Sequence, residues 1–206
     1  MKAPLSYQTM EYDCGPTTLI NAIRFLFRRS EIPPDVVKHI MLYSLDAYNC
    51  RGEFGKSGTS GMAMMFLSNW LNQFGRVKKF PIRCEFVTGP QVDVGQNSAL
   101  VGSLQQGGAV IARVRYGCWH YVLLTGADEG HVYLFDPYYR KKPFSAQGID
   151  LVEGRPGAAN RRVAADLLNS EGRGIYALGP RDKREAMLLY NENTRQSPLG
   201  TIEYFI

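Results

Sequence analysis

The first third of the chain carries apolar residues at three- and four-residue spacing, which is the repeat of an amphipathic helix. The pattern is strongest from Thr17 to Arg29. Arg28 and Arg29 fall in the last turn of this segment, where positive charge complements the helix dipole. The pair Pro33-Pro34 stops this segment, and proline is tolerated in the first turn of a following helix. Helices are therefore predicted from Thr17 to Arg29, from Pro34 or Asp35 onward, and from a cap at Thr59 or Ser60 to a stop at Gly75.

The rest of the chain changes to short runs rich in β-branched and aromatic residues, which indicate strands. One helix is expected among them, capped by Asn97 or Ser98 and running to Gln106, and a short one over Val163 to Leu168. The glycine-rich, polar segment from Arg140 to Arg162 predicts a long excursion. Strands are predicted at Pro81 to Val87, Ala109 to Val114, Tyr121 to Thr125, Val132 to Phe135, Gly174 to Leu178, Met187 to Tyr190 and Thr201 to Ile206. Helices followed by a mostly antiparallel sheet indicate an α+β fold.

Composition changes this picture little. The chain has 206 residues, of which 45% are hydrophobic and 21% charged, and this ordinary globular usage excludes wholesale disorder. The length fits a single domain over residues 1–206, and no stretch approaches the roughly 20 apolar residues of a membrane span. The first residues lack the apolar run of a signal peptide, so we expect a soluble, cytoplasmic protein. The net charge of +5 is spread over separate basic pairs, which argues against a nucleic-acid partner.

The number and spacing of the cysteines indicate whether disulfides or a metal site are expected. Four cysteines are too few for a disulfide scaffold, and none forms the C-x-x-C pair of a structural zinc site or a redox dithiol. We therefore expect reduced thiols, with no metal and no cofactor. Residues 50–61 hold four glycines and are expected to form a surface loop, while Cys118, two residues before His120, is expected to be a packing residue.

Cys14 stands directly before the first predicted helix and is the candidate nucleophile. Free backbone N–H groups and the positive end of the helix dipole stabilise a thiolate there, and the thiolate is the nucleophilic form. Gly15 lets a substrate come close to the backbone, and Pro16 lacks an N–H that would have no partner at this position. The position alone is equally compatible with a small buried residue.

A cysteine nucleophile needs a base, and the chain contains three histidines. His120 opens one predicted strand, and the following strand leads into Asp136 after a tight turn. If the turn is centred on Asp128, His120 and Asp136 lie directly opposite each other, so that the carboxylate can orient the imidazole. A turn one residue longer would place one of them on the other face of the sheet. His39 and His131 are expected to be structural.

A third candidate, Gln8, lies six residues before Cys14. Its side-chain amide can join the Cys14 backbone N–H in stabilising an oxyanion, or it can be solvated. The combined motifs resemble the C39 and C39-like cysteine peptidases of the papain-like superfamily. The resemblance is carried, in the family's order and spacing, by Gln8, Tyr12-Asp13-Cys14-Gly15-Pro16-Thr17, His120-Tyr121-Val122-Leu123-Leu124-Thr125-Gly126 and Phe135-Asp136-Pro137. It covers residues 5–139, and residues 140–206 form a C-terminal extension.

The resemblance implies a papain-like fold in which Cys14 is the nucleophile, His120 the base and acid, Asp136 the residue that orients His120, and Gln8 part of the oxyanion hole. It implies a peptide or protein substrate and a thioester acyl-enzyme. Family members fused to transporters remove leader peptides after a double glycine, whereas this sequence holds no transporter segment and its loop over residues 50–61 is enlarged.

Other interpretations stay open at this stage. The same acyl-enzyme serves a deamidase or a transglutaminase-like acyltransferase, which are not proteolytic. A catalytically idle papain-like module would keep the fold and only bind a partner, although all four catalytic positions are filled. The remaining class is a basic protein that binds nucleic acid or an anionic surface.

Overall fold

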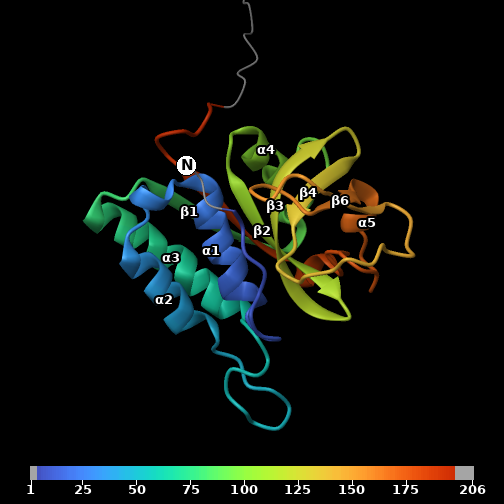
Figure 1. The fold of residues 1–206 in the computed structure, drawn as a ribbon, viewed down its shortest axis with the longest axis horizontal. Coiled ribbons are helices and arrows are strands. Elements are labelled where there is room, and N and C mark those ends of the chain that lie inside the picture. Colours follow the sequence, from blue (N-terminus) through green and yellow to red (C-terminus); the bar gives the residue numbers. More distant parts are fainter. Residues whose placement is uncertain (1–3, 198–206) are drawn as a thin grey trace, which may run out of the picture.

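The computed structural model describes residues 4–197, which form three long helices packed on a seven-stranded antiparallel sheet, with two shorter helices beyond it (Figure 1). The helices are α1 (Cys14–Leu26), α2 (Pro34–Ser44), α3 (Gly61–Lys78), α4 (Ala99–Gln105) and α5 (Ala165–Leu168). The strands are β1 (Ile82–Thr88), β2 (Ala109–Tyr116), β3 (Cys118–Asp128), β4 (His131–Phe135), β5 (Ile149–Leu151), β6 (Arg161–Ala164) and β7 (Glu185–Asn191). The α+β class predicted from the sequence is confirmed, and the strand predicted at Thr201 to Ile206 lies outside the described residues.

Both faces of the sheet are covered, which explains why its central strands are apolar throughout. In β2, Ile111 belongs to the core shared with α1, α2 and α3. Its neighbour Val110 belongs to a second core, shared with α4 and α5. Leu123 and Val122 alternate in the same way on β3. Successive side chains along each strand thus lie in two separate hydrophobic cores, one on each face of the sheet.

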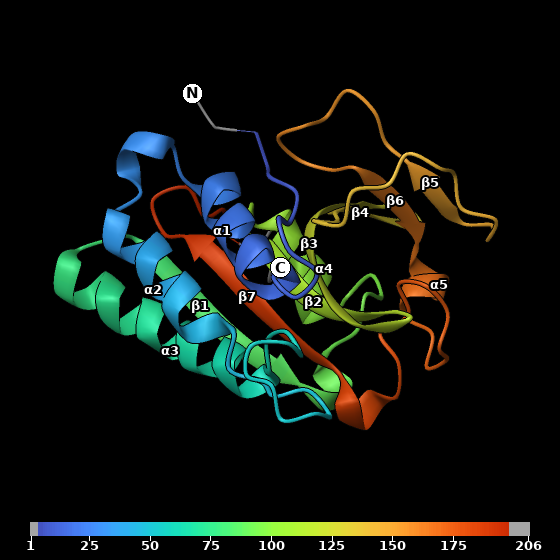
Figure 2. The same ribbon diagram turned by 60° about the horizontal axis from the view of Figure 1, so that its bottom comes forward.

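The strand that joins β1 to the rest of the sheet comes late in the chain. The strand order is β1-β7-β2-β3-β4-β6-β5, so β7 lies between β1 and β2 (Figure 2). Ile82 of β1 pairs with Asn191, and Ala109 of β2 pairs with Leu189. The segment after residue 140 is therefore part of the same sheet as the motif-bearing segment. The expectation of a single domain over residues 1–206 stays a prediction.

The third helix departs from the sequence prediction at its C-terminal end. Ser60 is the N-cap, as one of the two predicted candidates, but α3 does not stop at Gly75 and continues to Lys78. Lys79 then ends the helix in the left-handed conformation, with φ of 55°. Gly75 serves close packing instead, because a Cβ there would lie 2.8 Å from the carbonyl oxygen of Phe80.

Two predictions for the C-terminal extension are wrong. Residues 174–178 are not a strand, because Tyr176 has φ of 66° and an extended chain requires negative φ. The expected excursion over residues 140–162 contains β5 and the start of β6, so Val163, predicted as helical, lies in a strand. Helix α5 begins only at Ala165. Within residues 4–197, no helix is both long and apolar enough to cross a membrane.

Candidate active site

Cys14 is the first residue of α1, which begins three residues earlier than the apolar pattern predicted and ends at Leu26 rather than Arg29. At this end of a helix the backbone N–H groups have no helical acceptors and attract negative charge. The side chain of Cys14 is 8% exposed, so only a small part of it faces solvent.

The segment before Cys14 is fixed by two side chains. The carboxylate of Asp13, the N-cap of α1, accepts hydrogen bonds from the backbone N–H groups of Thr9 and Met10, both at 3.1 Å. Asn21 on α1 accepts from the N–H of Ser6 at 2.9 Å and donates to its carbonyl at 2.8 Å. These bonds hold the loop that carries the candidate oxyanion residue against the start of the helix.

His120 and Asp136 form a buried pair. The Nε2 atom of His120 lies 2.7 Å from Oδ1 of Asp136, with the two residues 6% and 0% exposed. The ring of Tyr116 packs against His120 with its centroid at 5.5 Å. Cys14 is close enough to His120 to help raise the pKa of the imidazole. Because Nε2 is occupied by the carboxylate, Nδ1 is the ring nitrogen left for the thiol.

The register that brings the pair together is not the predicted one. Asp128 pairs with His131 across a two-residue loop, so the turn is displaced from the predicted centre at Asp128. This turn alone would place His120 and Asp136 on opposite faces. A bulge between Leu124 and Gly126 shifts the register again, and beyond it Leu123 pairs with Phe135. His120 is thereby brought to the same face as Asp136, on the diagonal rather than directly opposite.

The carboxylate of Asp136 accepts hydrogen bonds on both oxygens. Besides His120, Oδ1 accepts the backbone N–H of Tyr138 at 2.7 Å, and Oδ2 accepts the hydroxyl of Tyr176 at 2.6 Å. The backbone of Asp136 is held as well, because its N–H donates to Oδ1 of Asn160 and its carbonyl accepts from Nδ2 of Asn160, both at 2.8 Å. Three hydrogen bonds thus fix the orientation of this carboxylate.

The environment of His120 favours the imidazolium. Burial lowers its pKa, but hydrogen bonds to Asp136 and Cys14, together with the charges of these two groups, outweigh burial and raise the pKa from 6.5 to about 10. A histidine in this state can return a proton to a leaving group.

Gln8 lies beside this pair but its amide is turned into its own loop. The backbone N–H of Gln8 donates to the carbonyl of Pro137 at 2.9 Å, which places Gln8 next to the Asp136 segment. Its Nε2 donates to the carbonyl of Met10 at 2.8 Å and, with longer geometry, to that of Glu11 at 3.4 Å. Its Oε1 is buried and has no hydrogen-bond partner among the described residues.

The loop over residues 50–61 packs against Gly15, the residue after the candidate nucleophile. Oγ1 of Thr59 lies where a Cβ on Gly15 would be, at 2.1 Å from that position. The base of the loop is closed by Asp46, whose carboxylate accepts the backbone N–H of Ser60 at 2.9 Å and the Ser60 hydroxyl. The loop predicted at the surface thus also packs against the start of α1.

The other candidate residues lie elsewhere or differ from expectation. His39 binds the carbonyl of Asp35 through Nδ1 at 2.7 Å and stacks on Trp70, and His131 lies at the hairpin turn. Cys118 is exposed, so its predicted packing role is wrong. Sequence reasoning missed Asn160, Arg161 and Tyr176, because they lie 24 to 40 residues from Asp136 in a segment without a motif.

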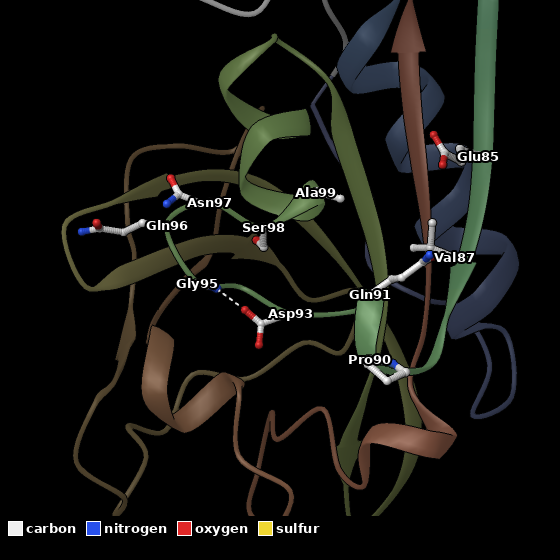
Figure 3. A pocket seen from close by; sticks show the side chains of 10 residues that line it. All are labelled: Glu85, Val87, Pro90, Gln91, Asp93, Gly95, Gln96, Asn97, Ser98 and Ala99. Carbon is white, nitrogen blue, oxygen red and sulfur yellow. Dashed lines mark hydrogen bonds between the residues drawn. The ribbon is translucent and has the colours of Figure 1, made fainter.

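A pocket of about 630 Å³ lies away from these residues (Figure 3). It is lined by residues of β1 and of the loop that leads into α4, and Asp93 is fixed in it by the N–H of Gly95 at 2.6 Å. None of Gln8, Cys14, His120 and Asp136 lines this pocket. Across residues 4–197, no group of three or more histidine, cysteine or acidic side chains is placed to hold a metal ion.

Two solved structures similar to this chain are peptidase domains. One is a double glycine motif protease from an AMS/PCAT transporter in complex with the leader peptide, with 10% identity, a TM-score of 0.44, and coverage of 91% of this chain and 89% of the other. The second is the peptidase domain of Streptococcus ComA, a bifunctional ABC transporter involved in quorum sensing, with 14% identity, a TM-score of 0.46, and coverage of 91% and 97%.

Sequence comparisons add nothing to this likeness. No protein-family model matches the chain, and no curated protein matches it. The chemistry proposed for this chain therefore rests on the geometry of its own side chains.

Proposed function

We propose that the chain is a papain-like cysteine hydrolase that cleaves a peptide or amide bond through a thioester on Cys14. The observation that carries this proposal is the buried hydrogen bond between Asp136 and His120, together with Cys14, the first residue of α1, as a second group that raises the pKa of His120. A histidine held in a fixed tautomer and a helix N-terminus both favour the thiolate, which is the nucleophilic form of cysteine.

In the first half of the reaction, Nδ1 of His120 takes the proton of the Cys14 thiol, and the thiolate adds to the carbonyl carbon of the substrate. The negative charge that develops on the carbonyl oxygen is stabilised by the backbone N–H at the start of α1. When the intermediate collapses, the carbon–nitrogen bond breaks, and the imidazolium of His120 gives its proton to the departing amine. A thioester remains on Cys14.

In the second half, His120 takes a proton from water while the water oxygen attacks the thioester carbon. The carbon–sulfur bond then breaks, the acid leaves, and Cys14 recovers its proton from His120. Asp136 keeps Nε2 of His120 protonated throughout, so that Nδ1 is the atom that exchanges protons with the thiol, the amine and the water.

Gln8 is proposed as a second donor to the oxyanion. The contact of its amide with the Glu11 carbonyl, at 3.4 Å, is weaker than that with Met10 at 2.8 Å. A modest rotation frees one amide hydrogen toward a substrate while the bond to Met10 is kept. Gln8→Glu, which keeps the shape and removes the donor, should lower kcat with little change in KM.

The first test needs no substrate. Iodoacetamide is applied to the native protein and to His120→Ala at about pH 6, where an ordinary thiol is almost wholly protonated, and each cysteine is followed by peptide mass spectrometry. Cys14 should react much faster than the exposed Cys50 and Cys118 in the native protein, and no faster than them in the variant. Equal rates for Cys14 and Cys118 in the native protein would refute the proposal.

A second test identifies the reaction. A peptide panel that includes double-glycine leader sequences is incubated with the native protein and with Cys14→Ala, and products are measured by mass spectrometry. Two shorter peptides indicate a peptidase, an intact peptide with glutamine converted to glutamate a deamidase, and a peptide joined to an added amine an acyltransferase. A reactive Cys14 without any product from the panel would point to a module that binds peptides without turnover.

A further inference from the structure

The C-terminal extension supplies the side chain that binds Oδ2 of Asp136, the carboxylate oxygen that does not contact His120. Oδ1 of Asp136 is shared between His120 and the backbone N–H of Tyr138, and Oδ2 has the Tyr176 hydroxyl as its partner at 2.6 Å. Tyr176 is fully buried, and burial and the Asp136 charge raise its pKa far above the ordinary value. The phenol therefore stays neutral and can donate a hydrogen bond.

The direction of this hydrogen bond is set by Arg161. Its Nε lies 3.2 Å from the Tyr176 hydroxyl, and a guanidinium can only donate. The hydroxyl oxygen thus accepts from Arg161, and its hydrogen is left for the Asp136 carboxylate. Arg161 is 2% exposed and, within residues 4–197, forms no direct ion pair with a carboxylate, so the hydroxyl connects a buried cation to a buried anion.

Further contacts hold Arg161 and Tyr176 in place. The other guanidinium nitrogens donate to the carbonyls of Asn160 at 2.8 Å and of Tyr138 at 3.2 Å. Tyr176 has φ of 66°, and its backbone N–H donates to the carbonyl of Arg115 at 2.7 Å. A non-glycine residue in the left-handed region is held there by its surroundings, and here the result is that the hydroxyl faces Asp136.

We propose that Tyr176 and Arg161 are positioning residues that hold the Asp136 carboxylate against His120. This inference rests on the function proposed above and adds that the extension after residue 140, outside the motif-bearing segment, is required to assemble the reactive pair. Neither residue touches the thiol or the imidazole. Each acts through the orientation of Asp136.

Removal of the hydroxyl lets the carboxylate rotate away from Nε2 of His120, because Oδ2 no longer has a donor. A carboxylate that has turned away stabilises the imidazolium less. In Tyr176→Phe, the thiolate of Cys14 should therefore form only at higher pH.

The test is the pH profile of Cys14 alkylation by iodoacetamide in the native protein and in Tyr176→Phe. At about pH 6 the rate should fall about tenfold in the variant, as expected for the loss of a hydrogen bond to a charged group, and should recover at alkaline pH. Tyr133→Phe is the matched control, because Tyr133 also donates to a carboxylate, Oδ2 of Asp128 at 2.8 Å, but at the hairpin turn. The control profile should equal the native one.

A second variant tests the role of the Arg161 guanidinium. Arg161→Lys keeps a charge but cannot make all three contacts, and its profile should shift in the same direction as that of Tyr176→Phe. Circular dichroism and a thermal melt confirm that each variant is folded, and a fold defect would lower the rate at every pH rather than shift the profile.

The outcomes separate this inference from the proposed function. A native profile with an acid-shifted Cys14 and an unchanged profile in folded Tyr176→Phe overturns the positioning role and leaves the hydrolase proposal intact. A native Cys14 that reacts like an ordinary thiol overturns both. A shifted profile in Tyr176→Phe with a native-like Tyr133→Phe supports the positioning role.

Discussion

Gly15 and Thr59 are in contact beside the nucleophile, at a distance that leaves no room for a Cβ on residue 15. A Cβ there would lie 2.1 Å from Oγ1 and 2.6 Å from Cβ of Thr59. Gly15→Ala must therefore displace either the start of α1 or the loop that carries Thr59. We expect a destabilisation of about 1–3 kcal/mol, measured by urea denaturation, and a clear loss of Cys14 alkylation at acidic pH.

A second substitution that removes the steric overlap tests whether this contact causes the effect of Gly15→Ala. The Thr59 hydroxyl has no hydrogen-bond partner in the described chain, so its removal breaks no bond. Gly15→Ala combined with Thr59→Gly should recover most of the Cys14 reactivity. Gly102→Ala is the control, because a Cβ on this α4 residue meets nothing within 4 Å, and it should stabilise the helix by up to about 1 kcal/mol. No recovery in the double variant would contradict the steric explanation.

Asn160 should matter for both stability and reactivity. It exchanges two buried hydrogen bonds with the backbone of Asp136, so Asn160→Ala leaves a donor and an acceptor without partners, and should lower the free energy of unfolding by about 2–4 kcal/mol. The rate of Cys14 alkylation at about pH 6 should fall as well, because Asp136 loses its backbone support.

Asn72 offers a matched control for that change. It makes the same two bonds to the backbone of Cys84 on β1, both at 2.8 Å, far along the sheet from His120. Asn72→Ala should destabilise the protein by a similar amount and leave the pH profile of Cys14 unchanged. A similar loss of Cys14 reactivity in both variants would show that reactivity follows global stability only.

The raised pKa of His120 predicts how stability depends on pH. The pKa is about 10 in the folded protein and near 6.5 in the unfolded chain, so the folded state binds this proton more tightly. The resulting stabilisation is fully present below about pH 6.5 and is lost as pH rises through about 10. Urea denaturation of the native protein and His120→Gln should show a stability difference that shrinks between these pH values. A constant difference would contradict the prediction.

Cys84 should report on global unfolding. Burial raises the pKa of its thiol far above the ordinary range, and the side chain is 3% exposed between β7 and α3. At about pH 9, where Cys50 and Cys118 are alkylated readily, Cys84 should react only at the rate at which the whole molecule opens. Its rate should rise with urea in proportion to the unfolded fraction. Fast reaction of Cys84 in the absence of urea would show that β1 opens locally.

Much of the fold could be predicted from local pattern, and the parts that could not have definite physical reasons. The helices and the strands β2, β3, β4 and β7 follow from apolar spacing, because each buries a face that the sequence displays. Gly75 does not stop α3, because the glycine is required by the close approach of Phe80, which no local pattern reveals. The order of the strands also depends on contacts between distant segments.

In the candidate site, too, some features follow from local sequence and others depend on contacts between distant segments. The positions of Cys14 at a helix start and of His120 and Asp136 on one hairpin follow from the sequence, but the bulge between Leu124 and Gly126 that restores their common face does not. Tyr176 could not be found because its role depends on a left-handed backbone in a segment that reads as a strand. Motifs thus indicate the reacting groups, whereas their support comes from tertiary contacts.

The place of β7 between β1 and β2 has a consequence for the timing of folding. Strands β1 and β2 are not neighbours, so β1 is linked to the other five strands only when β7, the last described strand, has been synthesised and inserted between them. Pairing over such sequence distances closes large loops and is slow. On the ribosome, a chain that already carries Cys14, His120 and Asp136 still lacks this link. Until residues 185–191 have been made, the edges of β1 and β2 that pair with β7 both lack their partner, so a nascent chain exposes two open strand edges.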